Sequence, residues 1–406
     1  MQVDLLKKIF GQLIVLAVLL ISSVSVSADY LDEAVEAIRK GEVKFNFRYR
    51  FEHVDLESFS RDANASTLRS RIGYSTGNLR GWTALVEADH LSSIGPERFN
   101  STENGRTDFP VVADPVGFDL NQALLRYKSD KVTATFGRQR INHADQRFIG
   151  GVAWRQNEQT YDAVRLQAKA HAKVSLDYAW IANVNRLFGP GDGAQPGDWQ
   201  GNSHIFKADY AAAEKHKFSV FAYLLDFEND NGPPNSTQTF GLTYNGGFGP
   251  LSVDATIATQ SDYEDSPLDY SAEFYSVAAS YAFKPVKLSV GYDVLGSDNG
   301  IAGFRTPLAT LHKFQGFADL FLGTPAAGIE DFHVGVAGKA GPIKLAAIWH
   351  DFKSNEGSVD YGTEINLVAT WPVTKRVTVQ AKFADYNADD FAIDATRFWF
   401  SAIVNL

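Results

Sequence analysis

The stretch Val43-Lys-Phe-Asn-Phe-Arg-Tyr-Arg-Phe-Glu-His53 alternates apolar or aromatic side chains with charged or strongly polar ones. Side chains of a β-strand point to opposite faces in turn, so this strand would have one apolar face and one ionic face. A soluble sheet seldom combines five large apolar side chains on one face with three cations and an acid on the other. The same alternation recurs along the chain, and its recurrence predicts an all-β fold, a transmembrane antiparallel β-barrel with a polar lumen.

The N-terminus, residues 1–28, is typical of a secretory signal peptide. Lys7 and Lys8 form a positively charged start, residues 13–21 are apolar, and Val26-Ser27-Ala28 supplies small residues for cleavage. The apolar run is short for a helix that spans a bilayer. We therefore expect export, with a mature chain that begins near Asp29.

Composition narrows the class of protein further. The 406-residue chain has a net charge of −10, and Lys7, Lys8 and Asp4 give the signal peptide +1, which leaves −11 on the mature chain. An acidic chain is not typical of nucleic-acid binding. Cysteine is absent, which excludes disulfides and thiolate metal sites. No linker or composition shift divides residues 42–406, so one closed sheet is the simplest organisation.

Residues 29–41 have a different period from the rest of the chain. Leu31, Val35 and Ile38 lie three or four positions apart, and Gly41 follows as a stop signal, which predicts a short helix. Two interpretations are open for this segment: a periplasmic helix, or a small plug over the mouth of a pore.

Alternating segments separated by turn residues predict about eighteen strands and long extracellular loops. After 43–53 they cover residues 66–75, 82–91, 118–128, 131–141, 160–169, 173–184, 203–211, 217–227, 236–245, 251–261, 271–282, 286–296, 329–339, 343–352, 362–371, 376–386 and 396–406. The last segment keeps its apolar residues on one parity up to Leu406. This is expected of a lipid-facing closing strand that the barrel-assembly machinery recognises.

Residues 311–322 also resemble a strand, but a nineteenth strand would give an odd count. Single-chain bacterial barrels normally have an even number, and the tight turn at 340–342 and both chain ends should be periplasmic. We therefore expect 297–328 to be one long outer loop. A barrel this wide leaves an aqueous channel unless something plugs it. Acidic loops at 189–202, 228–236 and 261–269 are interpreted as ordinary turns rather than calcium sites.

Basic side chains gather on the parity that would face the lumen. The first two strands and the closing strand, which are neighbours in a closed barrel, carry Arg48, Arg50, Arg69, Arg71 and Arg397; further candidates for an anion path are Lys44, Arg126, Arg138, Arg140 and Arg165. Guanidinium groups bind carboxylates through two parallel hydrogen bonds, so such a wall would guide anions. The alternative is that these arginines pair with Glu52, Glu87 and Asp89 and only support the barrel.

The opposite wall is predicted to be mildly polar or acidic, with Ser175, Asp177, Asp254, Thr256, Ser276, Ser289 and Asp293 on the lumen parity. No nucleophile motif stands out among the Ser, His and Asp residues, and no spacing favours a metal site. We therefore expect no catalytic residue, no cofactor and no metal ligand.

Two regions resemble the alginate-export family of outer-membrane porins. The first is 137–150 with Trp154-Arg-Gln-Asn157 and Tyr161-Asp-Ala163, and the second is 308–319 with Thr324-Pro325 and Gly328. The resemblance implies an eighteen-stranded barrel and an arginine-lined pore for acidic polysaccharide, constricted by loops. It also implies pore roles for Arg138 and Arg140, and an inward constriction that contains His312, Lys313 and Asp319.

The expected function is a passive bacterial outer-membrane porin for acidic saccharides or small organic anions. Its partners would be outer-membrane lipid, the transported anion and, as further candidates, periplasmic proteins. The alternatives are a nutrient-uptake porin of other or broad specificity, a sealed structural or adhesive barrel, and a barrel enzyme.

Overall fold

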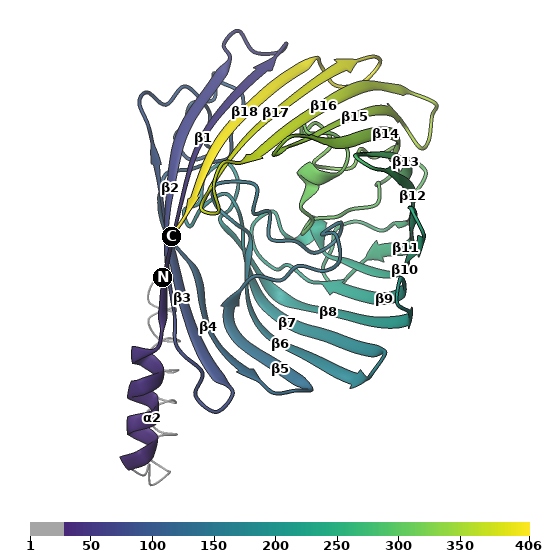
Figure 1. The fold of residues 1–406 in the computed structure, drawn as a ribbon. Coiled ribbons are helices and arrows are strands. Elements are labelled where there is room, and N and C mark those ends of the chain that lie inside the picture. Colours follow the sequence, from purple (N-terminus) through teal and green to yellow (C-terminus); the bar gives the residue numbers. More distant parts are fainter. Residues whose placement is uncertain (1–27) are drawn as a thin grey trace.

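The computed structural model describes residues 28–406, so the predicted signal peptide lies outside the described residues except for Ala28. Eighteen strands form one antiparallel sheet, in which each strand pairs with its neighbours in the chain. The pairing of β1 with β18 closes this sheet into a barrel (Figure 1). The predicted fold class and strand count are therefore confirmed.

Each predicted strand overlaps one observed strand. The strands are β1 Glu42–Leu56, β2 Ala63–Ser75, β3 Trp82–Ser93, β4 Gly117–Lys128, β5 Val132–Gln139, β6 Thr160–His171, β7 Val174–Asn185, β8 Asp198–Ala213, β9 His216–Leu225, β10 Thr237–Phe248, β11 Leu251–Asp262, β12 Ser271–Phe283, β13 Val286–Leu295, β14 Ile329–Ala340, β15 Ile343–Lys353, β16 Asp360–Pro372, β17 Val377–Ala388 and β18 Ala395–Asn405. The largest difference is β8, which begins at Asp198 instead of residue 203. A register shift between Ile181 and Asn183 interrupts the β7–β8 ladder, and pairing resumes beyond it.

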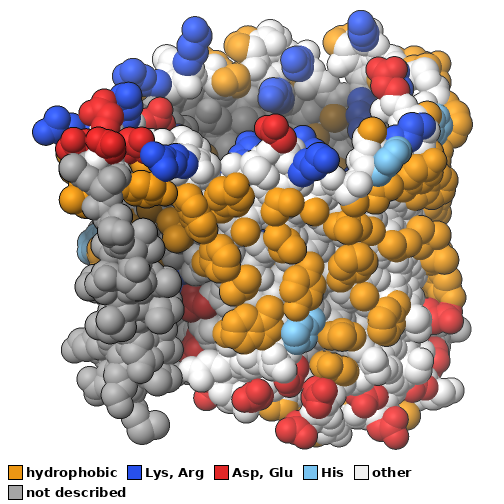
Figure 2. Space-filling model, turned by 90° about the horizontal axis from the view of Figure 1, so that it is seen from below, with side chains coloured by type: hydrophobic (Ala, Val, Ile, Leu, Met, Phe, Trp, Pro, Cys, Tyr) orange, Lys and Arg blue, Asp and Glu red, His pale blue; other side chains and the backbone are white. Residues whose placement is uncertain are grey.

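The alternation of side chains separates two environments. Tyr275 and Val277 on the outside of β12 are 47% and 51% exposed, whereas the inward-facing Arg48 and Arg50 of β1 are 7% and 2% exposed. On the face shown in Figure 2, the outer apolar side chains form a belt, with Lys and Arg near one rim and Asp and Glu at both rims. Because hydrocarbon favours such a belt around a closed sheet, the barrel is suited to the bacterial outer membrane.

Residues 297–328 contain no strand, as predicted, but they do not extend away from the barrel. The loop that includes them folds into the lumen, where Phe304, Leu308 and Phe321 are buried. These side chains join a cluster with wall residues such as Phe274 and Phe352. The apolar content that made this segment resemble a strand therefore serves packing inside the barrel, as the family resemblance implied.

The helix α2, Ala28–Arg39, lies outside the ring of strands (Figure 1). It is fixed to the short β2–β3 turn, where Gly77 N donates to Ala37 O at 2.8 Å and Arg80 pairs with Glu33 at 2.7 Å. This position favours a helix at the turn-bearing rim over a plug in the lumen. None of the described helices is long and apolar enough to cross a membrane.

The two faces of β11 should respond differently to a new charge. Ile257 is 54% exposed on the apolar belt, whereas its neighbour Thr256 lines an internal cavity. Ile257→Arg should lower the free energy of unfolding in lipid vesicles by about 2–4 kcal/mol, because the cation would enter hydrocarbon. Thr256→Arg is the matched control and should lower the free energy of unfolding much less, because its side chain faces the internal cavity. If urea titrations show an equal loss of unfolding free energy in the two variants, the assignment of Ile257 to the lipid face and Thr256 to the lumen face is wrong.

Candidate functional site

Two inward loops fill much of the lumen and are joined to each other. The β5–β6 loop covers residues 140–159 and the β13–β14 loop covers residues 296–328. Ile149 and Leu308 form a parallel bridge, and Gly150 N donates to Leu308 O at 2.8 Å. A Cβ at Gly150 would lie 2.4 Å from Thr310 Oγ1, so only glycine permits this approach. The loops therefore form one internal unit.

Arginines of the barrel wall hold the β5–β6 loop by its backbone. Arg48 Nη1 donates to Ala153 O at 2.9 Å and Arg50 Nη1 to Trp154 O at 2.7 Å. Arg48 Nε also donates to Gln156 Oε1 at 2.8 Å. Guanidinium groups suit this task because their donors are fixed in a planar fork. The basic wall predicted from the sequence exists, but a loop covers it.

Carboxylates neutralise the same wall. Arg71 contacts Asp89 at 2.5 Å and Glu158 of the loop at 2.7 Å. Burial alone would raise the pKa of Glu158, but Arg71 and Arg140 lower it to about 2. Glu158 therefore stays ionised at all physiological pH values and remains a permanent partner of the wall.

A second carboxylate, Glu52, is fully buried and lies within ion-pair distance of three arginines. Arg50 lies 2.7 Å from it, Arg155 of the β5–β6 loop 2.9 Å, and Arg397 of the closing strand 3.8 Å. The seam between β1 and β18 is thereby connected to the inward loop. Since an unpaired buried charge is costly, these groups are mutually dependent.

The remaining candidates lie in several separate environments. Arg138 pairs with Asp162 at 2.7 Å, Arg165 with Asp177 at 2.5 Å, and Arg140 contacts Glu87 and Glu158. Lys44 is exposed beside Glu42. Arg126 is exposed, and no ion pair to it occurs within residues 28–406. The buried arginines thus fit the alternative interpretation, in which they pair with Glu52, Glu87 and Asp89 and support the barrel. Their proposed contact with passing anions stays a prediction.

The predicted constriction residues lie where the β13–β14 loop meets the β5–β6 loop. His312 is stacked on Trp154 with ring centroids 3.5 Å apart, and its Nδ1 lies 2.8 Å from Asp319. Burial lowers the pKa of His312 to about 3, although Asp319 acts in the opposite direction. Its Nε2 contacts Lys382 of β17. His312 and Asp319 are thus packing groups, whereas Lys313 is exposed on the other side of the loop.

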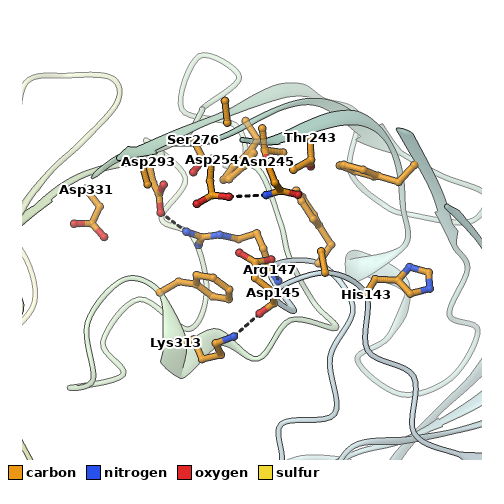
Figure 3. Close-up of a pocket in the computed structure, with 18 of the residues that line it drawn as sticks. His143, Asp145, Arg147, Thr243, Asn245, Asp254, Ser276, Asp293, Lys313 and Asp331 are labelled. Carbon is orange, nitrogen blue, oxygen red and sulfur yellow. Dashed lines mark hydrogen bonds and ion pairs between the residues drawn. The ribbon is translucent and has the colours of Figure 1, made fainter. Parts of the chain in front are cut away.

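A cavity of about 530 Å³ remains between the joined loops and the wall that carries β8–β15. Four cations, Arg147, Lys207, Lys217 and Lys313, and four carboxylates, Asp145, Asp254, Asp293 and Asp331, line it. Figure 3 shows Arg147 and Lys313 entering from the loops opposite Asn245, Asp254 and Ser276 of the wall. Sequence reasoning identified Lys313 and much of the polar wall but missed Arg147, Lys207 and Lys217.

A second pocket, of about 610 Å³, lies at the rim that carries the short turns. It contains Lys284, Lys287, Lys339 and Lys344. Lys339 and Lys344 are directly opposite each other across the β14–β15 hairpin. None of these four lysines pairs with a carboxylate of the described chain, residues 28–406. They could have been found from the turn at 341–342, which fixes the register of that hairpin.

The two pockets share a wall. On β14, Asp331 and His333 line the cavity, and Ala337 and Lys339 line the pocket at the rim. On β15 the same order runs from His350 and Ile348 to Ala346 and Lys344. Small inward residues, such as Gly335 and Ala337, separate the polar ends. These strands therefore connect the centre of the lumen with its lysine-bearing mouth.

Comparisons with known proteins agree with this architecture. The crystal structure of Pseudomonas aeruginosa OccK3 (OpdO) has a TM-score of 0.68 at 10% identity, covering 94% of this chain and 99% of that chain. Acinetobacter baumannii OccAB2 has a TM-score of 0.68 at 12% identity, with 91% and 99% covered. P. aeruginosa OpdK, solved with vanillate, gives 0.68 at 10% identity, also with 91% and 99% covered. At these identities the likeness shows the fold alone.

Sequence comparison identifies the family. No curated protein matches the chain significantly. The family model for alginate export, however, matches residues 40–338, which is most of the chain and includes both inward loops. The protein therefore belongs to the alginate-export family, and its closed eighteen-stranded barrel is a porin-like channel of the bacterial outer membrane.

Proposed function

We propose that this channel passes acidic saccharides or small organic anions by passive diffusion along the β13–β15 wall. The observation that carries this proposal is the continuous row of inward residues that joins the central cavity to the lysine-bearing mouth. Mobile cations with no fixed carboxylate partner attract anions more effectively than buried, paired guanidinium groups. The anion-contacting residues are then Lys287, Lys339 and Lys344, together with Lys313 of the β13–β14 loop, whereas Arg147 is paired with Asp293.

The central cavity suits a solute with both carboxylates and hydroxyl groups. Arg147 and Lys313 present positive charge from the loop side. The facing wall offers hydroxyl and amide groups from Thr243, Thr256 and Asn245. Such groups both donate and accept hydrogen bonds, as saccharide hydroxyls do. An acidic saccharide would therefore orient its carboxylate to the loops and its hydroxyls to the wall.

Passage also requires that no anion binds too tightly. Arg147 contacts Asp293 and donates to Gln315 at 2.7 Å, so part of its hydrogen-bonding capacity is already used. The four cavity carboxylates weaken the attraction of the four cations at short range. Moderate binding at successive sites favours conduction over capture.

Aromatic side chains support a second candidate, the uptake of small aromatic carboxylates. Phe148, Phe221, Phe274 and Phe314 line the same cavity as the cations. Flat apolar rings beside cations suit a ligand with an aromatic ring and a carboxylate. Vanillate, with which OpdK was solved, belongs to this chemical class. Comparing current block by oligouronates with block by vanillate separates the two candidates.

The mouth lysines should set ion selectivity. In planar bilayers under a KCl gradient, the triple variant Lys287→Gln, Lys339→Gln, Lys344→Gln should bring the reversal potential closer to zero than that of the wild-type channel. Loss of positive charge lowers the local anion concentration, most clearly at low salt. Lys131→Gln, at an exposed position in the short β4–β5 turn, is the control. Selectivity that is unchanged in the triple variant would contradict the proposed path.

The buried arginines should instead set the width of the channel. Arg71→Gln leaves Asp89 without its arginine partner and Glu158 with Arg140 as its closest remaining cation, and breaking such a buried pair costs about 3–5 kcal/mol. The β5–β6 loop should then detach part of the time, which would raise conductance and current noise. Arg80→Gln, which removes an exposed pair outside the barrel, is the matched control. A shift in selectivity with unchanged conductance would instead assign Arg71 to the anion path.

Acid should loosen the inward loops. Because the pKa of His312 is about 3 in the fold and about 6.5 in an unfolded chain, its contribution to loop stability is lost as pH falls from about 6.5 to 3. Burial opposes ionisation of Asp319, but His312 and Arg397 lower its pKa, so the contribution of Asp319 is lost only at more acidic pH than that of His312. Channel noise should rise between pH 7 and pH 4. His312→Gln, which cannot titrate, should show a smaller rise; an identical rise would exclude His312 as a source.

A further inference from the structure

Two histidines and an aspartate meet on the part of the central cavity wall that β14 and β15 form. Asp331 and His333 share the inward face of β14, and His350 lies directly across from His333 on β15. One ligand atom from each residue lies within 4.8 Å of the others. This cluster was not expected from sequence spacing, because its members come from two strands.

The distances fit the ligand set of a divalent transition metal. His350 Nδ1 lies 2.9 Å from Asp331 Oδ1, and His333 Nδ1 lies 3.8 Å from the same oxygen. Ligands bound tetrahedrally at about 2.0–2.1 Å are separated by about 3.3–3.4 Å. The two observed separations lie on either side of this value, so small side-chain shifts would admit an ion.

Two further features indicate that His333 is held for a ligand. Its Nδ1 is shielded from solvent and has no hydrogen-bond partner among residues 28–406. Its ring occupies space that glycine provides, because a Cβ at Gly291 would lie 2.2 Å from its Nε2. A buried imidazole nitrogen without a partner is costly, and a metal ion would remove that cost.

We propose that Asp331, His333 and His350 bind one divalent transition-metal ion, Zn²⁺, Cu²⁺ or Ni²⁺, at the wall of the channel. Two imidazoles and one carboxylate suit these ions. The remaining coordination positions face the cavity and would take water. Such an ion adds two positive charges beside Asp293 and Asp331, at a place where passing solutes contact the wall.

Binding is tested without reference to conduction. The full mature chain, purified in detergent without a histidine tag, is titrated with Cu²⁺ and examined by electron paramagnetic resonance. We expect one Cu²⁺ per chain with hyperfine splitting from two imidazole nitrogens. A spectrum without nitrogen splitting would overturn the site even if the channel conducts anions as proposed above.

Variants then assign the ligands. His333→Ala and His350→Ala should each weaken Cu²⁺ binding at least about tenfold, since even the loss of a supporting residue costs about 10–100-fold. His143→Ala is the matched control, because His143 lines the same cavity but lies 3.1 Å from Tyr223 Oη. Gly291→Ala, which retains every ligand, should weaken binding by displacing the His333 ring. Binding equal to wild type in the double histidine variant would refute the assignment.

Single-channel recording gives a functional readout. Micromolar Zn²⁺ or Ni²⁺ should change the open current reversibly, with recovery after a chelator is added, and His143→Ala should behave as wild type. The change should disappear in His333→Ala. If Cu²⁺ binds with nitrogen splitting but leaves the current unchanged, the metal site stands and the conduction path runs elsewhere in the lumen.

Discussion

The contact between the arginines of β1, β2 and β18 and the β5–β6 loop determines the arrangement of the lumen. Guanidinium groups that are 2–8% exposed must find acceptors inside the barrel. Backbone carbonyls of 153–156 and the carboxylates of Glu52, Asp89 and Glu158 supply them. The loop is thereby fixed to one wall, and the second loop packs on the first through Ile149 and Leu308. The central cavity lies between these loops and the opposite wall.

The wall that anchors the loop and the wall that lines the cavity differ in composition. A buried ion pair contributes little net stability, but it specifies one position for the loop because each unpaired alternative leaves a charge in a low-dielectric interior. The wall of β8–β15 has a different composition, with hydroxyl groups, amides, carboxylates and lysines beside the two pockets. Concentrated positive charge in a sequence can therefore mark the wall to which an inward loop is anchored.

Much of the fold was predictable because the alternation of apolar and polar side chains follows directly from the two faces of each strand. Val43 to His53 and seventeen further segments gave the strand count, and the parity of Arg397 correctly placed it beside the arginines of the first strands. The site was less predictable, because Glu158 and Arg147 belong to loops whose path depends on packing within the lumen. The pairs Lys339–Lys344 and His333–His350 were predictable in principle, although they belong to the site. The turn at 341–342 fixes the register of β14 and β15, so counting residues outward from this turn gives both pairs.

The electrostatic potential in the lumen depends on the order of charged residues along the wall rather than on their total number. Asp331 and Lys339 lie eight residues apart on β14, which corresponds to about 26 Å along the strand. Screening in physiological salt acts over about 8 Å, so the carboxylate does not cancel the lysine at this separation. On the path proposed above, an anion at the mouth would therefore be attracted by Lys339 and Lys344. It would then be repelled near Asp331 unless Arg147, Lys313 or a metal ion at the two histidines offsets that carboxylate. On the proposed path, the passage of anions would thus depend on the residues around Asp331, the carboxylate that shares its wall with His333 and His350.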